Sequence, residues 1–187
     1  MIVSLRKFMN GEIEMQLKLG EMLHRFRVGK NIEAQNLCLG LCSESVMSMI
    51  ENGKRVPDVL LFEKLVERMG ISPENFSIMV TEEEYEYLKW REAVCDAIEN
   101  LELDTLHGLL ESPIARKTYC NEILEKQFYS YASAVASGLA GDYQKALSLL
   151  HIAAEQTIPD VGKVLESDTC LCVMELHILM LYLYYGM

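Results

Sequence analysis

A short segment in the first third of the chain holds the local pattern that most restricts how the chain can fold. Residues Ala34–Leu39 suit a short helix, and Gly40 then marks a tight turn. Ser43 is a favourable N-cap for a second helix over Glu44–Glu51, which Asn52-Gly53 closes with left-handed backbone. Two short helices joined by a tight glycine-containing turn form a helix-turn-helix arrangement.

Further helices are expected on both sides of this segment. A first helix over Glu12–Arg27 has one apolar face and should end at Gly29. A fourth helix is expected from an apolar stripe that consists of Leu61, Phe62, Leu65, Val66 and Met69. Ser72-Pro73 then has the cap and first-turn proline of a fifth helix. No strand pattern intervenes, so residues 1–78 are predicted to form a five-helix domain.

The second half of the chain also has only helical patterns. The run Thr81–Glu84 is a capping box, and it should start a long helix over Glu82–Leu101. The other expected helices are Leu103–Leu110, Ala115–Leu139 after a break at Ser112-Pro113, Tyr143–Gln156 ended by Pro159, and Ser167–Tyr185. The predicted fold class is therefore all-α, with residues 79–187 as a second helical domain.

The net negative charge of the chain lies entirely in its second part. The formal net charge is −11, from 17 Lys/Arg and 28 Asp/Glu. Residues 1–77 carry 10 of each sign, so residues 78–187 carry 7 Lys/Arg against 18 Asp/Glu, which is 7 − 18 = −11. Repulsion of a polyanion such as DNA thus falls on the second part. The first part is neutral, so any DNA affinity there should be modest and salt-sensitive.

Cysteine usage indicates a reducing compartment. The six cysteines are Cys38, Cys42, Cys95, Cys120, Cys170 and Cys172. Their spacings match neither a zinc ribbon nor a CxxC motif, so we interpret them as small buried apolar residues in preference to metal ligands or disulfides. The N-terminal residues do not have the layout of a signal peptide. We therefore expect a cytoplasmic protein.

Enzymatic, metal and membrane functions are not expected. The four histidines (His24, His107, His151 and His177) suit neither a catalytic triad nor a metal site, and no phosphate-binding loop is present, so no cofactor is expected. The apolar run Leu171–Tyr185 is short for a membrane span and contains Glu175 and His177. We interpret it as a repeat helix whose exposed face associates with a second copy of the chain.

The segment Leu19–Phe76 resembles the phage-repressor-like (Xre/Cro) helix-turn-helix family. The similarity is most specific in the run GLCSESVMSMIENGKRVP at residues Gly40–Pro57, whose turn is one residue shorter than in most of the family. That variant looks like the peptide-pheromone-receptor branch of the Rgg/PlcR type, in which tetratricopeptide-like repeats follow the head. Residues Gln127–Asp160 span 34 positions, the tetratricopeptide period. The resemblance implies a lambda-repressor-like head and a repeat domain that is shorter here than in the family.

The resemblance also implies roles for individual residues. Arg27 on the first helix is expected to pair with Glu51 and so to fix the recognition helix, while Met47 and Ile50 face inward. The residues expected to contact base edges are Glu44, Ser45 and Met49. The residues expected to contact phosphates are Ser43, Asn52, Lys54 and Arg55. Glu33-Ala34 departs from the family, which often has Ser/Thr and then a phosphate-gripping Gln at this place.

Together these features predict a DNA-binding transcriptional regulator that acts on double-stranded DNA as a homodimer. By resemblance, a short quorum-sensing peptide would bind the repeat domain and control the protein; no peptide-binding residue is assigned. The alternative is a helical-repeat interaction module with a degenerate head that does not bind DNA. The non-basic recognition helix and Glu33-Ala34 favour that alternative. Salt-dependent binding to promoter DNA would separate the two.

Overall fold

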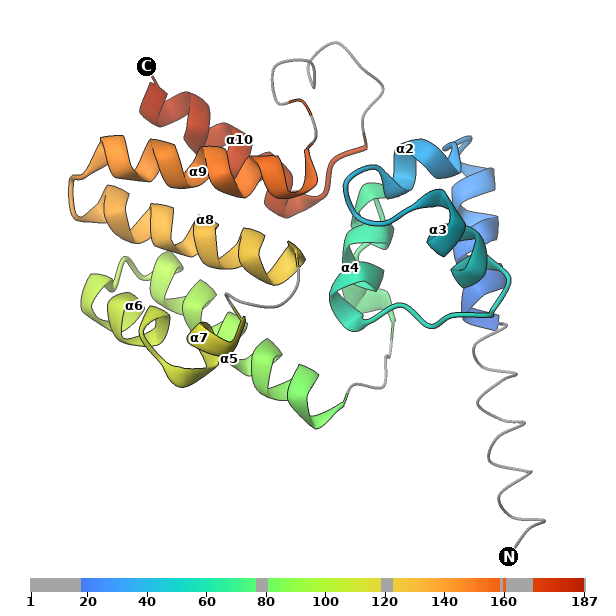
Figure 1. Cartoon of the computed structure of the whole chain (residues 1–187), viewed down its shortest axis with the longest axis horizontal. Helices are drawn as coiled ribbons and strands as arrows, with labels where there is room; N and C mark the ends of the chain where they lie inside the picture. Colours follow the sequence, from blue (N-terminus) through green and yellow to red (C-terminus); the bar gives the residue numbers. More distant parts are fainter. Residues whose placement is uncertain (1–17, 77–80, 119–122, 159, 161–169, 187) are drawn as a thin grey trace, which may run out of the picture. The chain divides into compact units, whose positions relative to one another are not determined.

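The chain folds into helices, in agreement with the predicted all-α class (Figure 1). The computed structural model describes residues 18–76, 81–118, 123–158, 160 and 170–186, and no strand occurs among them. The chain divides into two compact units, of residues 1–76 with 168–170 and of residues 77–167 with 171–187.

The first unit contains short helices around one apolar core. Its elements are a first helix described over residues 18–29, α2 (Ala34–Cys38), α3 (Glu44–Glu51), α4 (Val59–Arg68) and the 3-10 turn η1 (Pro73–Asn75). The predicted stripe of α4 is buried in full, from Leu61 to Met69. It packs in a core that includes Leu23 and Leu37. Asp58, which was not singled out from the sequence, caps α4 by accepting a hydrogen bond from the Leu61 N–H at 2.8 Å.

The first helix ends at Gly29 as predicted, but the left-handed residue that closes it is Asn31, with φ 56°. The Ile32 N–H donates to the Arg27 carbonyl and the Asn31 N–H to the Val28 carbonyl, which is the Schellman pattern. Asparagine tolerates left-handed backbone better than most residues, so it can replace glycine at this place.

The expected fifth helix is a single 3-10 turn in the described residues. The Ser72 side chain makes no capping hydrogen bond there, although Pro73 does occupy the first position. Phe76 instead packs edge-on against Phe26 and Phe62, with ring centroids 6.3 and 5.3 Å away. The chain after α4 is therefore held against the core, up to residue 76, by aromatic packing and not by a further α-helix.

The second unit is a series of longer helices. They are α5 (Glu82–Glu99), α6 (Leu103–Leu110), α7 (Pro113–Thr118), α8 (Ile123–Leu139), α9 (Tyr143–Thr157) and α10 (Val173–Gly186). The capping box is confirmed, because the Thr81 hydroxyl and the Glu84 carboxylate each accept from the other's backbone N–H. The helices break after Leu110 close to the predicted place, but Pro113 itself begins α7, and the Ser112 hydroxyl accepts from the Ala115 N–H.

Two predicted helix boundaries in the second unit differ from the structure. The single helix expected over Ala115–Leu139 is replaced by α7 and α8, and residues 119–122 between them lie outside the described part. The last helix begins at Val173, and the predicted start at Ser167 also lies outside the described part, as does Pro159. Helix ends that depend on contacts with other helices are not encoded in a local pattern.

The second unit is a stack in which α9 lies between α8 and α10 (Figure 1). Ala134, Ala146 and Ala153 are fully buried, so α8 and α9 can approach closely. Leu150 and Ile178 complete this core from α9 and α10. Among the described residues, no helix has both the length and the apolar character that crossing a bilayer requires.

Candidate nucleic-acid interface

The helix α3 has one buried and one exposed side. Met47 and Ile50 point into the core and are 0% and 1% exposed, as predicted. The helix begins at Ser43, whose hydroxyl accepts a hydrogen bond from the Val46 N–H at 3.2 Å. It ends at Glu51, and Gly53 after it has φ 64° and donates its N–H to the Ile50 carbonyl. The start and end of α3 are thus fixed by its own sequence.

All seven residues predicted to contact DNA are exposed to solvent, in whole or in part. They are Ser43, Glu44, Ser45, Met49, Asn52, Lys54 and Arg55, which we call the α3 surface. The first four lie on α3 or at its N-cap, and the others follow its end. The amide of Asn52 already donates to the Ser48 carbonyl at 2.8 Å, so this side chain also holds the last turn of α3. The same amide nitrogen also donates to the Ser48 hydroxyl at 3.4 Å.

Arg27 and Glu51 form a bidentate ion pair between the first helix and the end of α3. Arg27 Nε donates to Glu51 Oε1 at 2.6 Å, and Nη2 donates to Oε2 at 3.0 Å. The third guanidinium nitrogen, Nη1, donates to the Ile32 carbonyl at 2.9 Å. His24 Nδ1 lies 2.9 Å from Glu51 Oε2. The sequence pattern suggested this pair only through the family resemblance, and the structure brings its two residues together.

The surroundings of the pair keep both groups ionised. The hydrogen bond to Glu51 raises the pKa of Arg27, and this outweighs the opposite effect of burial. Burial by itself raises the pKa of Glu51, but the hydrogen bonds from Arg27 and His24 outweigh it, so the pKa is lowered. The carboxylate of Glu51 is therefore neutralised by its partner and adds little negative potential to the α3 surface.

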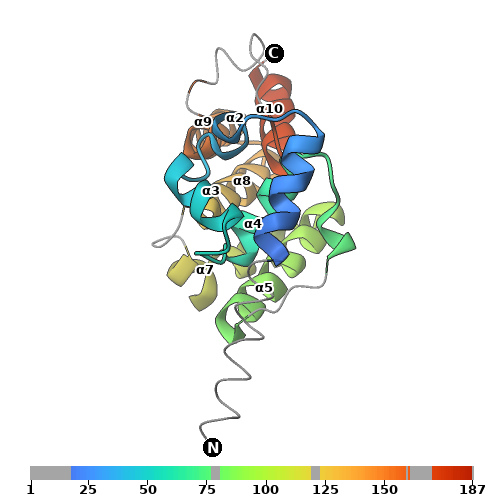
Figure 2. The same cartoon turned by 90° about the vertical axis from the view of Figure 1, so that its right-hand side faces the viewer.

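A close backbone approach places α3 against the first helix (Figure 2). A Cβ atom built on Gly20 would collide with the carbonyl oxygens of Ile50 and Glu51, the latter at 2.7 Å. Only glycine therefore lets the two helices lie at this separation. Gly20 was not singled out from the sequence, because a glycine within a helical pattern does not reveal what approaches it.

A second arginine secures the end of α2. Arg68 on α4 is buried, and its Nη1 donates to the carbonyls of Leu37 and Leu39 at 2.9 and 2.6 Å. These carbonyls lie where α2 ends, so the guanidinium satisfies acceptors that have no partner within the helix. The indication in the sequence that Arg68 binds the end of α2 was weak. It consisted of a basic residue three positions after Leu65, on the apolar side of α4.

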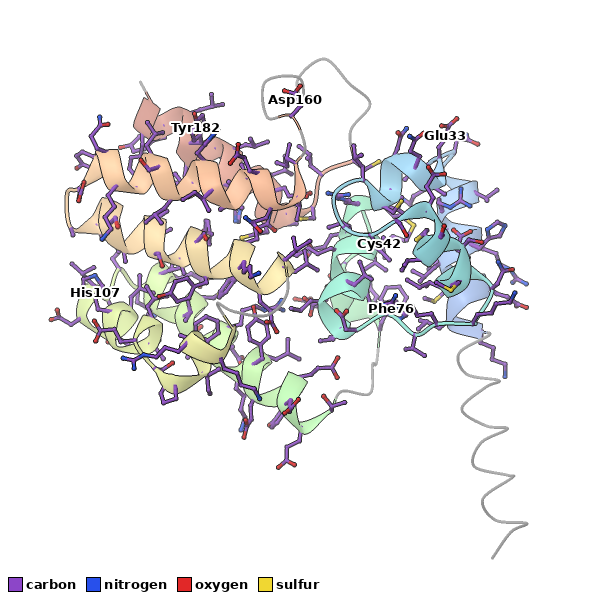
Figure 3. All side chains as sticks on the ribbon, viewed as in Figure 1. Glu33, Cys42, Phe76, His107, Asp160 and Tyr182 are labelled. Carbon is purple, nitrogen blue, oxygen red and sulfur yellow. The ribbon has the colours of Figure 1, made fainter. Side chains whose placement is uncertain are left out.

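The start of α2 differs from that of a typical phosphate-binding helix. Glu33 occupies the N-cap position without a side-chain capping bond and is exposed (Figure 3). It presents a carboxylate where the family often presents a hydroxyl. The exposed cations near α3 are Lys54 and Arg55, which follow its C-terminal end. Positive charge is thus concentrated at one end of the α3 surface, and Glu44 lies at the other.

Two thiols are neighbours here, that of Cys38 at the end of α2 and that of Cys42 in the turn before α3. Cys38 is buried and Cys42 is partly buried. Burial, together with the neighbouring Cys38 thiol, raises the pKa of Cys42 to about 11. The two cysteines therefore act as packed neutral side chains at neutral pH, and Cys120 lies outside the described residues. No cluster of potential metal ligands occurs in the described part of the chain.

Comparison with protein-family models, curated proteins and solved structures found no match. The functional interpretation therefore depends on the geometry of the α3 surface and on the sequence resemblance of Leu19–Phe76.

Proposed function

We propose that this chain is a DNA-binding transcriptional regulator in which α2 and α3 form the helix-turn-helix and α3 is the recognition helix. The observation that carries the proposal is the anchoring of α3. Its inner side is buried through Met47 and Ile50, its last turn is tied to Arg27, and its outer side is open. A helix held rigidly with an exposed polar side is what insertion into a major groove requires.

The side chains of the α3 surface can make only modest sequence-specific contacts with bases. Glu44 could accept a hydrogen bond from cytosine N4, Ser45 could bond to several bases, and Met49 could touch a thymine methyl. Lys54 and Arg55 would meet phosphates, which position the protein without reading sequence. Two heads on one palindromic site would add their contacts, so we propose that the regulator acts as a homodimer.

Selection from random-sequence duplexes at low salt tests this function and does not require a known operator. We expect the full chain to enrich a common sequence, and the double variant Lys54→Ala/Arg55→Ala to lose at least about tenfold in affinity for it. The matched control is Arg116→Ala/Lys145→Ala, which removes the same charge from the second unit. Failure of the parent to enrich any sequence would reject DNA binding.

An interaction module with a head that no longer binds DNA is the second candidate. Glu33 at the start of α2 and Glu44 at the start of α3 favour it, since both place a carboxylate where DNA would approach. This candidate predicts no duplex binding above background at low salt. The same selection experiment therefore decides between the two functions.

We also propose that a short peptide controls this regulator, and this part of the proposal rests on the family resemblance. The stacked helices α8, α9 and α10 support it, because repeats of antiparallel helices present extended binding surfaces. The regulator would then act in the cytoplasm and without enzymatic activity. Calorimetric titration with a synthetic peptide, encoded by a small reading frame beside the gene, would test it. If none of these peptides produces a heat of binding, control by a peptide is rejected.

A further inference from the structure

The turn between α2 and α3 brings Cys42 back beside Cys38. Leu39, with φ −52° and ψ 121°, and Gly40, with φ 74°, fit the two central positions of a type II β-turn. The Cys38 carbonyl accepts hydrogen bonds from the N–H groups of Leu41 at 2.9 Å and of Cys42 at 3.0 Å. Glycine suits the second central position, because the backbone there is left-handed. The backbone therefore holds these two cysteines as neighbours.

The two thiol groups meet at the boundary between the core and the solvent. Cys38 is 2% exposed and Cys42 is partly exposed, so a small ion can reach the pair from the side of Cys42. The Cys42 thiol donates a hydrogen bond to the Cys38 sulfur, and the Cys38 thiol donates to the Gln35 carbonyl at 3.7 Å. Both hydrogen bonds are weak, because a thiol is a weak donor and sulfur is a weak acceptor. An ion with high affinity for sulfur can therefore replace the two protons at little cost in hydrogen bonding.

Charged side chains near the pair favour a bound group with one negative charge. Burial and the Cys38 thiol raise the pKa of Cys42 to about 11, but the charges of Arg55 and Arg68 act in the opposite sense and favour its thiolate. Arg68 is itself buried and hydrogen-bonds to the carbonyls on both sides of Cys38. Burial, and then the charge of Glu44, raise the pKa of Cys38. Two guanidinium groups thus stand against one carboxylate, which suits an anionic complex at this place.

The number of sulfur ligands determines which ions this pair can hold. No group of three or more potential metal ligands occurs among the described residues, so the pair does not complete the tetrahedral site that Zn(II) requires. Soft monovalent ions such as Cu(I) and Ag(I) bind thiolates strongly and are satisfied by two of them. The spacing of the cysteines did not indicate such a site in the sequence, because only the turn brings the two sulfur atoms together.

We propose that Cys38 and Cys42 form a two-coordinate site for a soft monovalent cation such as Cu(I). Binding replaces the two thiol protons, so that one M+ ion and two R–SH groups give an M(SR)2 anion and two protons, without a change of oxidation state. The site lies directly before Ser43, the N-cap of α3, so a bound ion crosslinks the end of α2 to the start of α3. The site does not depend on the proposed binding of DNA.

Anaerobic titration of the reduced full chain with Cu(I), in competition with the chelator bicinchoninate, tests the site. The reference chain carries Cys170→Ala/Cys172→Ala, because these two are the other closely spaced cysteines of the sequence. We expect the reference chain to bind one Cu(I) ion, and a further Cys42→Ala substitution to lower its affinity at least about 100-fold, because one of two ligands is lost. Cys42 is partly exposed, so this variant should keep the helix content of the reference chain. The matched control Cys95→Ala, also at a partly exposed cysteine, should bind Cu(I) as the reference chain does.

Thermal unfolding gives a second measurement, which responds only to a site that the folded chain forms. Cu(I) should raise the melting temperature of the reference chain, but not that of the variants with Cys42→Ala or Cys38→Ala, because it binds the folded state through both thiols. Zn(II) at the same concentration should raise none of these temperatures.

Three results would overturn the proposal. The first is a Cu(I) affinity that Cys42→Ala leaves unchanged, and the second is an affinity that Cys95→Ala lowers equally. The third is a Zn(II) affinity as high as that for Cu(I), because it would require ligands beyond the two thiols. A chain that enriches no DNA sequence can still show the expected Cu(I) binding, so the proposed function and this site can fail separately.

Discussion

Arg27 and Glu51, 24 residues apart in sequence, are joined by hydrogen bonds of 2.6 and 3.0 Å that tie the first helix to the end of α3. Their side chains are only 14% and 11% exposed, so the pair is screened from solvent more than a surface salt bridge is. This contact, more than the helix propensity of eight residues, holds α3 in a fixed orientation.

Removal of one partner should therefore destabilise the first unit. We expect Glu51→Ala to lower the free energy of unfolding by roughly 1.5–3 kcal/mol, because it leaves a partly buried guanidinium without its acceptor. Urea unfolding followed by far-UV circular dichroism measures this. The control is Glu21→Ala, which removes an exposed pair with Arg25 at 3.9 Å and should cost less than about 0.5 kcal/mol. Equal effects of the two substitutions would contradict the assigned role.

The same pair should make the stability of the first unit sensitive to acid. The pKa of Glu51 lies below its ordinary value of 4.5, so the unfolded chain binds this proton at a higher pH than the folded chain does. The stabilisation is therefore complete above pH 4.5 and is lost as the pH falls toward the folded-state pKa. Unfolding measured from about pH 7 to about pH 3 should show a shallower acid decline in Glu51→Gln than in the parent. If the stability of the parent and of Glu51→Gln declined equally with acid, the lowered pKa of Glu51 would be contradicted.

Two glycines of the first helix should respond in opposite ways to replacement by alanine. Gly20→Ala should destabilise the first unit by about 1–3 kcal/mol, since the new methyl meets the backbone of Ile50 and Glu51. Gly29→Ala should stabilise it by up to about 1 kcal/mol, because Gly29 is helical and nothing lies within 4 Å of the added atom. Thermal unfolding of the two variants checks both signs. Tolerance of Gly20→Ala would mean that the helices are not in close contact.

Cys42 should react slowly with alkylating reagents at neutral pH. Burial and the Cys38 thiol raise its pKa to about 11 from an ordinary value of 9.0, so its thiolate fraction at neutral pH is reduced about 100-fold. Mass spectrometry after timed iodoacetamide treatment should show the Cys42 rate increasing up to about pH 11. A plateau below pH 9.0 would contradict the buried environment of this thiol.

A chain of buried hydrogen bonds should stabilise the second unit. Gln127 Nε2 donates to the Thr157 hydroxyl at 2.7 Å, and that hydroxyl donates to Glu175 Oε1, so α8, α9 and α10 are linked. Thr157→Val should cost about 1–3 kcal/mol, because Gln127 and Glu175 each lose a hydrogen-bond partner inside the core. Unfolding followed by the fluorescence of Trp90, the only tryptophan, reports this unit. The exposed control Ser148→Ala should change the free energy of unfolding by less than about 0.5 kcal/mol.

The sequence predicted those features that local chemistry determines. The bounds of α3 followed from a serine cap and a left-handed glycine, which act within a few residues of themselves. The buried positions of α4 followed from helical periodicity. Asn31 was missed because a glycine two residues earlier was a stronger end signal, although the backbone turns at the asparagine.

Features that depend on tertiary approach could not be predicted. The need for glycine at position 20 arises only when α3 lies against the first helix. Arg68 reaches the end of α2 from a distant part of the sequence, so no local pattern contains both ends of its hydrogen bonds. The outward position of the α3 surface was predicted through the family resemblance, but the hydrogen bond of the Asn52 amide to the last turn of α3 was not. A charge count could not indicate the role of either Arg27 or Arg68.

The salt dependence of binding to the selected duplex tests most directly whether the α3 surface contacts DNA. If Lys54 and Arg55 contact phosphates, the slope of log K against log salt should become shallower by about 2 in the double alanine variant. The sequence preference among duplexes should stay the same, because phosphate contacts carry no base information. An unchanged slope, or a parent chain whose affinity does not depend on salt, would contradict the assignment of the α3 surface to DNA.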